Sequence, residues 1–218
     1  MENKDRISLG IILPFLFLLH VAGCDVEFGS GDSGGSSSST DAVLSGEVLE
    51  ISSGADVEGI AVELEDENSG FTYDGTTDSG GGFMVSGGFC GTSLVTLTDS
   101  EGEQLAVFSL YILPGSDTDI GNLSISSGTV TFEDDTITDF DGYVTENDCG
   151  STSGTLTVEI DNDCDTVDAL VTVNRTTNIT DGSDDIDCDA INVGAELRIY
   201  GGMSAGSSVE AYDIEVIN

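Results

Sequence analysis

Basic residues are nearly absent from this chain of 218 amino acids. Lys and Arg together number four against 42 Asp and Glu, His occurs once, Trp is missing, and the formal net charge at pH 7 is −38. Lys4, Arg6 and His20 lie in the first 23 residues, which we interpret below as a cleaved signal peptide. The mature protein is therefore expected to carry only two cations, Arg175 and Arg198.

Each of these absences excludes a class of chemistry. Without His, the mature chain has no Ser-His-Asp or Cys-His catalytic pair and no imidazole ligand for a metal. Without Lys, it has neither a Schiff-base nucleophile nor a phosphate-binding P-loop. The negative field repels phosphate, so we expect no nucleic-acid partner. Carboxylates remain, but no Asp or Glu pair stands out by spacing as the acid and base of a glycosidase, and we expect no enzyme.

The amino-terminal segment has the three parts of an export signal. Lys4 and Arg6 precede an apolar run over residues 7–19, and two small residues follow the run. This run is shorter than the roughly 20 apolar residues that a helix needs to cross a bilayer. We therefore interpret residues 1–23 as a signal peptide and not as a membrane-spanning helix.

A cysteine stands directly behind this segment. The tetrapeptide Val-Ala-Gly-Cys that ends at Cys24 resembles the lipobox of bacterial lipoproteins. The resemblance implies that Cys24 is lipidated and anchors the chain in the cell envelope, at the periplasmic face of the inner membrane or at the outer membrane. A plain secretory signal with a chance cysteine is the alternative. Residues 24–41, rich in Gly and Ser, would then form a tether that holds the folded part clear of the lipid.

The rest of the chain is typical of β-structure. Short segments rich in Val, Ile, Thr and Tyr are separated by clusters of Gly, Ser, Asn and Asp. Near residue 60 the apolar side chains of Ile60, Val62 and Leu64 alternate with Ala61, Glu63 and Glu65. Because neighbouring side chains of a strand point to opposite faces, this alternation predicts antiparallel sheets with one buried and one charged face, as in a sandwich or barrel.

A spaced set of small, polar and apolar residues runs through residues 42–126. Its members are Gly46, Val48, Gly59, Val62, Leu64, Thr76, Thr77, Asp78, Gly81 and Phe83. The set resembles the carboxypeptidase regulatory-like, transthyretin-type β-sandwich, which implies a spacer, a stabilising module or a binding platform. Independently, Asp78 and the glycines behind it predict a tight hairpin, with Phe83 starting the returning strand in the core.

A second set of residues occupies positions 127–218. Its members are Gly142, Val144, Leu156, Val158, Val171, Val173, Asn174, Thr177, Val193, Gly194, Leu197, Ile199, Gly201, Ala211, Ile214 and Val216. The set resembles a domain of unknown function from exported bacterial proteins, a small barrel without an established activity. The expected fold class is therefore all-β: an antiparallel β-sandwich followed by a small Greek-key, OB-like β-barrel.

Four cysteines remain behind Cys24, at Cys90, Cys149, Cys164 and Cys188. An even number in an exported chain favours disulfides, and three full pairings exist. We favour Cys149–Cys188, because strand alternation brings these two loops to one end of the barrel. Free thiols and metal ligands are the alternatives.

One acidic loop has calcium-like spacing. Asp185, Asp187, Asp189 and Glu196 occupy positions 1, 3, 5 and 12 of an EF-hand-like loop, but Ala190 stands where that turn needs Gly. These four residues are weak calcium candidates, and solvated loops are the favoured interpretation. We expect no cofactor.

These observations together predict a lipid-anchored cell-envelope binding or structural module without catalytic activity. Its expected partners are the membrane, through the lipid anchor, and an envelope protein or a glycan. The main alternative is a calcium- or carbohydrate-dependent adhesion module, and a carboxylate-based glycan hydrolase is the more remote one.

Overall fold

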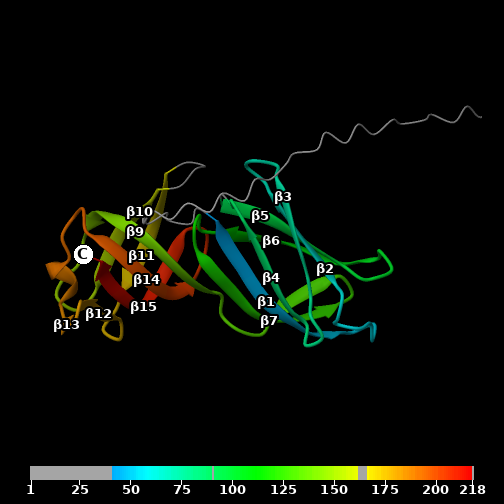
Figure 1. Ribbon diagram of the computed structural model, residues 1–218. Coiled ribbons are helices and arrows are strands. Elements are labelled where there is room, and N and C mark those ends of the chain that lie inside the picture. The colour runs from blue at the N-terminus through cyan, green and yellow to red at the C-terminus, as the bar shows by residue number, and fades with distance from the viewer. Residues whose placement is uncertain (1–40, 90, 162–165, 218) are drawn as a thin grey trace, which may run out of the picture. The chain divides into compact units, whose positions relative to one another are not determined.

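The computed structural model describes residues 41–89, 91–161 and 166–217 (Figure 1). Fifteen strands and one short 3-10 helix fill these ranges, which contain no α-helix. The predicted all-β fold class is confirmed. None of the described residues belongs to a helix long and apolar enough to cross a membrane.

The amino-terminal half of the described chain holds eight strands. They are β1 (Ala42–Ile51), β2 (Ala61–Asp66), β3 (Thr72–Thr76), β4 (Gly82–Gly87), β5 (Gly91–Thr98), β6 (Gln104–Ile112), β7 (Asp117–Ser126) and β8 (Thr129–Phe132). Strands β3, β2, β5 and β6 form a four-stranded antiparallel sheet in that order, and β4, β1, β7 and β8 pair in a second sheet.

The two sheets of this half share one hydrophobic core. Alternate residues of β2, such as Val62 and Leu64, are buried as the sequence predicts, and Leu44 and Val48 of β1 are buried in the same core. One pairing differs from the antiparallel expectation, because β1 runs parallel to β7. Local alternation marks which face of a strand is buried but carries no information about the direction of its neighbour.

The carboxyl-terminal half forms a closed barrel. Its elements are β9 (Ile137–Asn147), β10 (Gly154–Ile160), β11 (Val167–Val173), β12 (Asn178–Asp181), β13 (Asp184–Asp185), the 3-10 helix η1 (Cys188–Ala190), β14 (Glu196–Met203) and β15 (Ser208–Ile217). Strand β9 pairs with β10, β10 with β11, β11 with β15, β15 with β14, and β14 again with β9.

This cycle of five strands confirms the predicted small β-barrel. All its pairs are antiparallel except β11 with β15. Its core takes alternate residues from each strand, including Leu156 and Val158 of β10 and Val171 of β11. Strands β12 and β13 extend the sheet beside β15.

The two halves are joined by strand pairing as well as by the chain. Strand β7 pairs with β9, where Asp117 lies opposite Asp139. Buried hydroxyls meet beside this pairing, because Ser116 Oγ lies 3.0 Å from Thr118 Oγ1, which lies 3.3 Å from Thr138 Oγ1. Strand β8 lies beyond residue 126, where the first of the two residue sets in the sequence ends, and still pairs with β7.

The turn at Asp78 forms, but the predicted hairpin does not. Asp78 Oδ1 accepts hydrogen bonds from the backbone N–H groups of Gly80 at 2.8 Å and Gly82 at 3.1 Å. Phe83 behind the turn is buried, as expected. However, β3 before the turn belongs to the four-stranded sheet and β4 after it pairs with β1, so the chain crosses between the sheets. A hairpin and a crossing turn use the same turn residues, so the sequence signal could not distinguish them.

Candidate functional site

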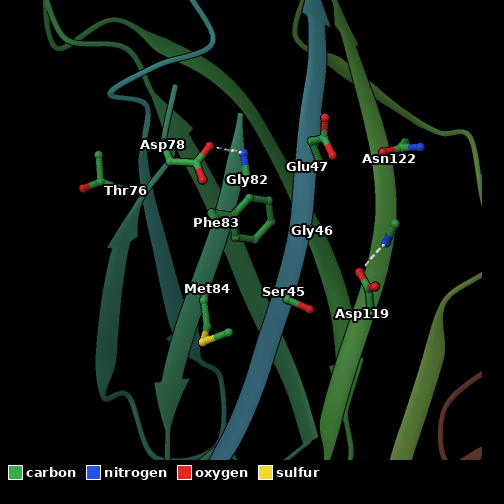
Figure 2. A pocket seen from close by; sticks show the side chains of 11 residues that line it. Ser45, Gly46, Glu47, Thr76, Asp78, Gly82, Phe83, Met84, Asp119 and Asn122 are labelled. Carbon is green, nitrogen blue, oxygen red and sulfur yellow. Dashed lines mark hydrogen bonds between the residues drawn. The ribbon is translucent and has the colours of Figure 1, made fainter. Parts of the chain in front are cut away.

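An open groove of about 610 Å³ lies over strands β4, β1 and β7 (Figure 2). Ser45 and Glu47 contribute to it from β1, Met84 from β4, and Asp119 and Asn122 from β7. Met84 is 65% exposed, so its thioether is open to contact. The groove thus combines one exposed thioether with carboxylate, amide and hydroxyl groups.

Alternation along β1 places its polar groups in this groove. Leu44 and Val48 point into the sandwich core, so the odd-numbered neighbours Ser45 and Glu47 face outward. Between them, Gly46 allows the Phe83 ring to lie against β1, as Figure 2 shows. A Cβ atom at this glycine would lie 2.9 Å from Phe83 Cζ, closer than packed atoms allow.

Backbone hydrogen bonds fix two of the groove's carboxylates. One is Asp78, whose bonds to its turn are described above. The other is Asp119, whose Oδ1 accepts a hydrogen bond of 2.9 Å from the N–H of Gly121. The next N–H, that of Asn122, donates to Asp134 Oδ2 at 3.2 Å. These bonds hold the side chains in place without cancelling their negative charge.

The chemistry of the groove favours ligands that donate hydrogen bonds. Carboxylate oxygens of Glu47, Asp78 and Asp119 can only accept when ionised. The hydroxyl of Ser45 and the amide of Asn122 can both donate and accept. A neutral ligand rich in hydroxyl groups, or a cationic one, is compatible with this set, whereas an anion is not.

The best-defined charged contact lies on the outer face of the barrel. Arg198 on β14 pairs with Asp141 on β9 through two hydrogen bonds of 3.0 Å, from Nε and Nη2 to the two carboxylate oxygens. Next to this pair, burial raises the pKa of Asp139, with Arg198 acting in the opposite direction. Tyr200 and Tyr212 lie nearby on β14 and β15, with ring centroids 6.0 Å apart and both rings partly exposed.

One predicted disulfide is confirmed. Cys149 and Cys188 are bonded and close a loop with a sequence separation of 39. Asn147 supports the link, because its Nδ2 donates to the carbonyls of Cys188 and Ile191 and its Oδ1 accepts from the N–H of Cys149. The barrel end that these loops form is therefore braced twice.

Three other predicted cysteine sites lie outside the described residues. These are the lipidation site Cys24 and the disulfide candidates Cys90 and Cys164. Their predictions stay untested.

The calcium candidates are spread over separate elements. Asp185 ends β13, Asp187 precedes η1, Asp189 lies inside η1, and Glu196 begins β14. Within the described ranges, no three His, Cys, Asp or Glu side chains come together as a group that could hold a metal ion. The EF-hand-like spacing is thus not matched by convergence in space, because no helices flank the loop to fold it back on itself.

Sequence reasoning missed most of the groove. It singled out Gly46 and Asp78 for their part in the fold, but not Glu47, Asp119 or Asn122. The outward positions of β1 were a usable signal, since they alternate with buried ones. Their meeting with β7, where Ser45 lies opposite Asp119, depends on a pairing between distant segments.

Comparison with known proteins adds no family. No protein-family model matches this chain, and no curated protein matches it. Among solved structures it is similar to a leucine-rich repeat protein from Bacteroides thetaiotaomicron VPI-5482, at 11% identity and a TM-score of 0.25. The match covers 82% of this chain and 24% of the other, so this chain spans about a quarter of that protein's length. A likeness at this level carries no argument about function.

Proposed function

We propose that this protein is a lipid-anchored binding module of the bacterial cell envelope, without catalytic activity. The observation that carries the proposal is a disulfide, Cys149–Cys188, in a chain that begins with a lipobox-type signal. Disulfides persist in oxidising compartments outside the cytosol, so this bond supports export. The lipid on Cys24 and the tether over residues 24–41 would then leave the β-structure free to meet a ligand.

We also propose the finer family relationships that the sequence suggests. Residues 42–126 would be a carboxypeptidase regulatory-like, transthyretin-type module, and residues 127–218 an OB-like domain of the kind found in exported bacterial proteins. The buried positions of Val48, Val62 and Phe83 support the first relationship. The closed five-stranded pairing supports the second. Both would act as platforms rather than as enzymes.

A carbohydrate is the ligand class that we favour for the groove over β4, β1 and β7. Its carboxylates accept hydrogen bonds from sugar hydroxyls, and Met84 offers an apolar contact for the C–H face of a ring. Since the protein's own charge repels anions, neutral glycans are favoured over uronic acids or phosphorylated sugars. This would make the protein an adhesion module.

The anchor is tested by replacing the lipidation site. We expect radiolabelled palmitate to enter the wild-type protein and not the Cys24→Ser variant, which should remain unprocessed or appear in the soluble fraction, because lipoprotein processing acts through that sulfur. Equal labelling of both proteins would refute the lipoprotein proposal.

The groove is tested by filling it. Binding of the wild-type protein to an array of neutral and acidic glycans is compared with that of Ser45→Trp, whose indole would occupy the middle of the groove. Val107→Trp, at an exposed position on β6, controls for the added indole. We expect neutral glycans to bind wild type and the control but not Ser45→Trp. Equal binding to all three proteins would place any glycan site elsewhere.

A further inference from the structure

A second hollow, of about 420 Å³, lies at the end of the barrel that the disulfide braces. Its floor is apolar, with Val173 and Ile179 buried. Its rim is polar and includes Arg175, Asp187, Ser151 and Thr152. This size is within the usual range of small-molecule pockets, roughly 300–1,000 Å³. The hollow is separate from the groove on the sandwich half.

The arginine on this rim forms no ion pair with a carboxylate of the part of the chain that the structure describes. Over the described residues the structure contains one ion pair, between Arg198 and Asp141. Arg175 thus forms no ion pair with any described carboxylate, although the sequence is rich in them. Its guanidinium therefore offers a fork of donors of the kind that binds a carboxylate through two parallel hydrogen bonds.

The residues around Arg175 are already committed to other bonds. Asn174 donates to Glu210 Oε1 and accepts from Thr176, and Thr177 Oγ1 donates to the carbonyl of Ala211. These bonds fix the loop that carries Arg175. The free polar groups of the hollow are thus the guanidinium, the two hydroxyls and one carboxylate.

That carboxylate, Asp187, stands on another loop of the rim. It precedes η1 but makes no side-chain hydrogen bond to cap it. Its neighbour Cys188 is bonded to Cys149, and the rim hydroxyls of Ser151 and Thr152 follow Cys149 within three residues. The disulfide therefore ties together two loops that line the hollow, one with Asp187 and the other with Ser151 and Thr152.

We propose that this hollow binds a zwitterionic α-amino acid with an aliphatic side chain. Arg175 binds the ligand's carboxylate, Asp187 accepts hydrogen bonds from its ammonium group, and the side chain lies on the floor formed by Val173 and Ile179. The inference goes beyond the proposed function, because it concerns a different site and holds whether or not the chain is lipidated.

Charge decides for a zwitterion over simpler ligands. A ligand with a carboxylate alone is repelled by the field of a chain with a net charge of −38. A ligand with an ammonium group alone is repelled by the Arg175 guanidinium at the site itself. A zwitterion has no net charge to be repelled and satisfies both charged groups of the rim.

Saturation-transfer NMR on the purified protein with three matched probes tests the proposal. L-leucine carries both charges, N-acetyl-leucine lacks the ammonium group, and leucinamide lacks the carboxylate. We expect transfer to the leucine methyl groups and at least about tenfold weaker binding of the other two, equivalent to about 1.4 kcal/mol. Similar binding of all three probes would overturn the inference. So would the absence of saturation transfer to leucine.

Two arginine variants provide the matched comparison. Arg175→Gln removes the pocket's cation, while Arg198→Gln makes the same change of charge on the outer face of the barrel. We expect the first to reduce leucine binding at least about tenfold, as loss of a charge-assisted contact does, and the second to leave it unchanged. Arg175→Lys, which keeps the charge but loses the planar fork, should bind leucine with intermediate affinity. Such partial rescue would show that the loss in Arg175→Gln comes from the missing charge and not from misfolding. Equal binding by both glutamine variants would refute the role of Arg175.

Discussion

At the scale of single residues, Asp139 on β9 links stability to pH. It is half-buried, and burial raises its pKa; the Arg198 guanidinium opposes this, and Asp141 and Asp117 add to it. The folded state therefore holds this proton more tightly than the unfolded state does. Below about pH 4 the group is protonated in both states. As pH rises from there through the folded pKa, the unfolded state ionises first and stability is lost.

Asp139→Asn should remove this loss. We expect the variant to have a higher free energy of unfolding than wild type at pH 7 and the same free energy near pH 3, measured by urea denaturation. Asp168→Asn, at an exposed position on β11, is the control for the general relief of negative charge. If both variants gained equally at pH 7, burial at Asp139 would have no part in the effect.

At the scale of elements, two turns share one hydrogen-bonding pattern. In the first, Asp78 accepts from the N–H groups two and four residues ahead, and Asp99 does the same in the second. Each turn has a glycine three residues after the aspartate, and Gly81 and Gly102 both have φ of 88°. Only their surroundings differ, because a Cβ on Gly81 would clash with the Val48 carbonyl oxygen while one on Gly102 would meet nothing.

Alanine at these two positions separates backbone strain from packing. We expect Gly102→Ala to cost about 1–2 kcal/mol, the penalty of a left-handed conformation. Gly81→Ala should cost about 1–3 kcal/mol more, because β1 and β4 must move apart. Equilibrium unfolding measures both, and equal losses would show that the contact with β1 is unimportant.

The disulfide brace is a second prediction at this scale. Replacing Cys149 and Cys188 together by Ala should lower the free energy of unfolding by about 2–4 kcal/mol, the usual effect of a bond that closes a loop of this size. Peptide mapping without reductant should recover the two cysteines as one linked pair. Recovery of Cys149 linked to another cysteine in the native protein would contradict the pairing.

At the scale of the whole molecule, the excess of carboxylates governs the response to salt. Unfolding separates like charges, so screening should stabilise the folded state. We expect sodium chloride to raise the melting temperature smoothly, and calcium and magnesium at matched ionic strength to act alike, in thermal scans. A rise with calcium alone that is lost in Asp187→Asn would instead indicate a site among Asp185, Asp187, Asp189 and Glu196, since a bound ligand stabilises only the state that binds it.

Much of the fold follows from residues whose surroundings are local. The buried face of β2 is visible in the alternation of Val62 and Leu64 with Glu63 and Glu65, and the turn at Asp78 in its glycines. The favoured cysteine pair was also correct, because two loops at one end of a small barrel must lie close. The candidate site was far less predictable, since Ser45 and Asp119 are neighbours only through strand pairing.

The sequence by itself determined the all-β class, the buried faces, the turn residues and a chemistry dominated by 42 acidic residues with only four Lys and Arg. These depend on side-chain type and on spacing along one strand, which can be read without knowing the neighbouring strands. Only the tertiary structure decided that β1 runs parallel to β7, that β3 and β4 belong to different sheets, and that Arg175 and Asp187 share one hollow. Those relations join distant segments, and they arise from burying many apolar faces at once.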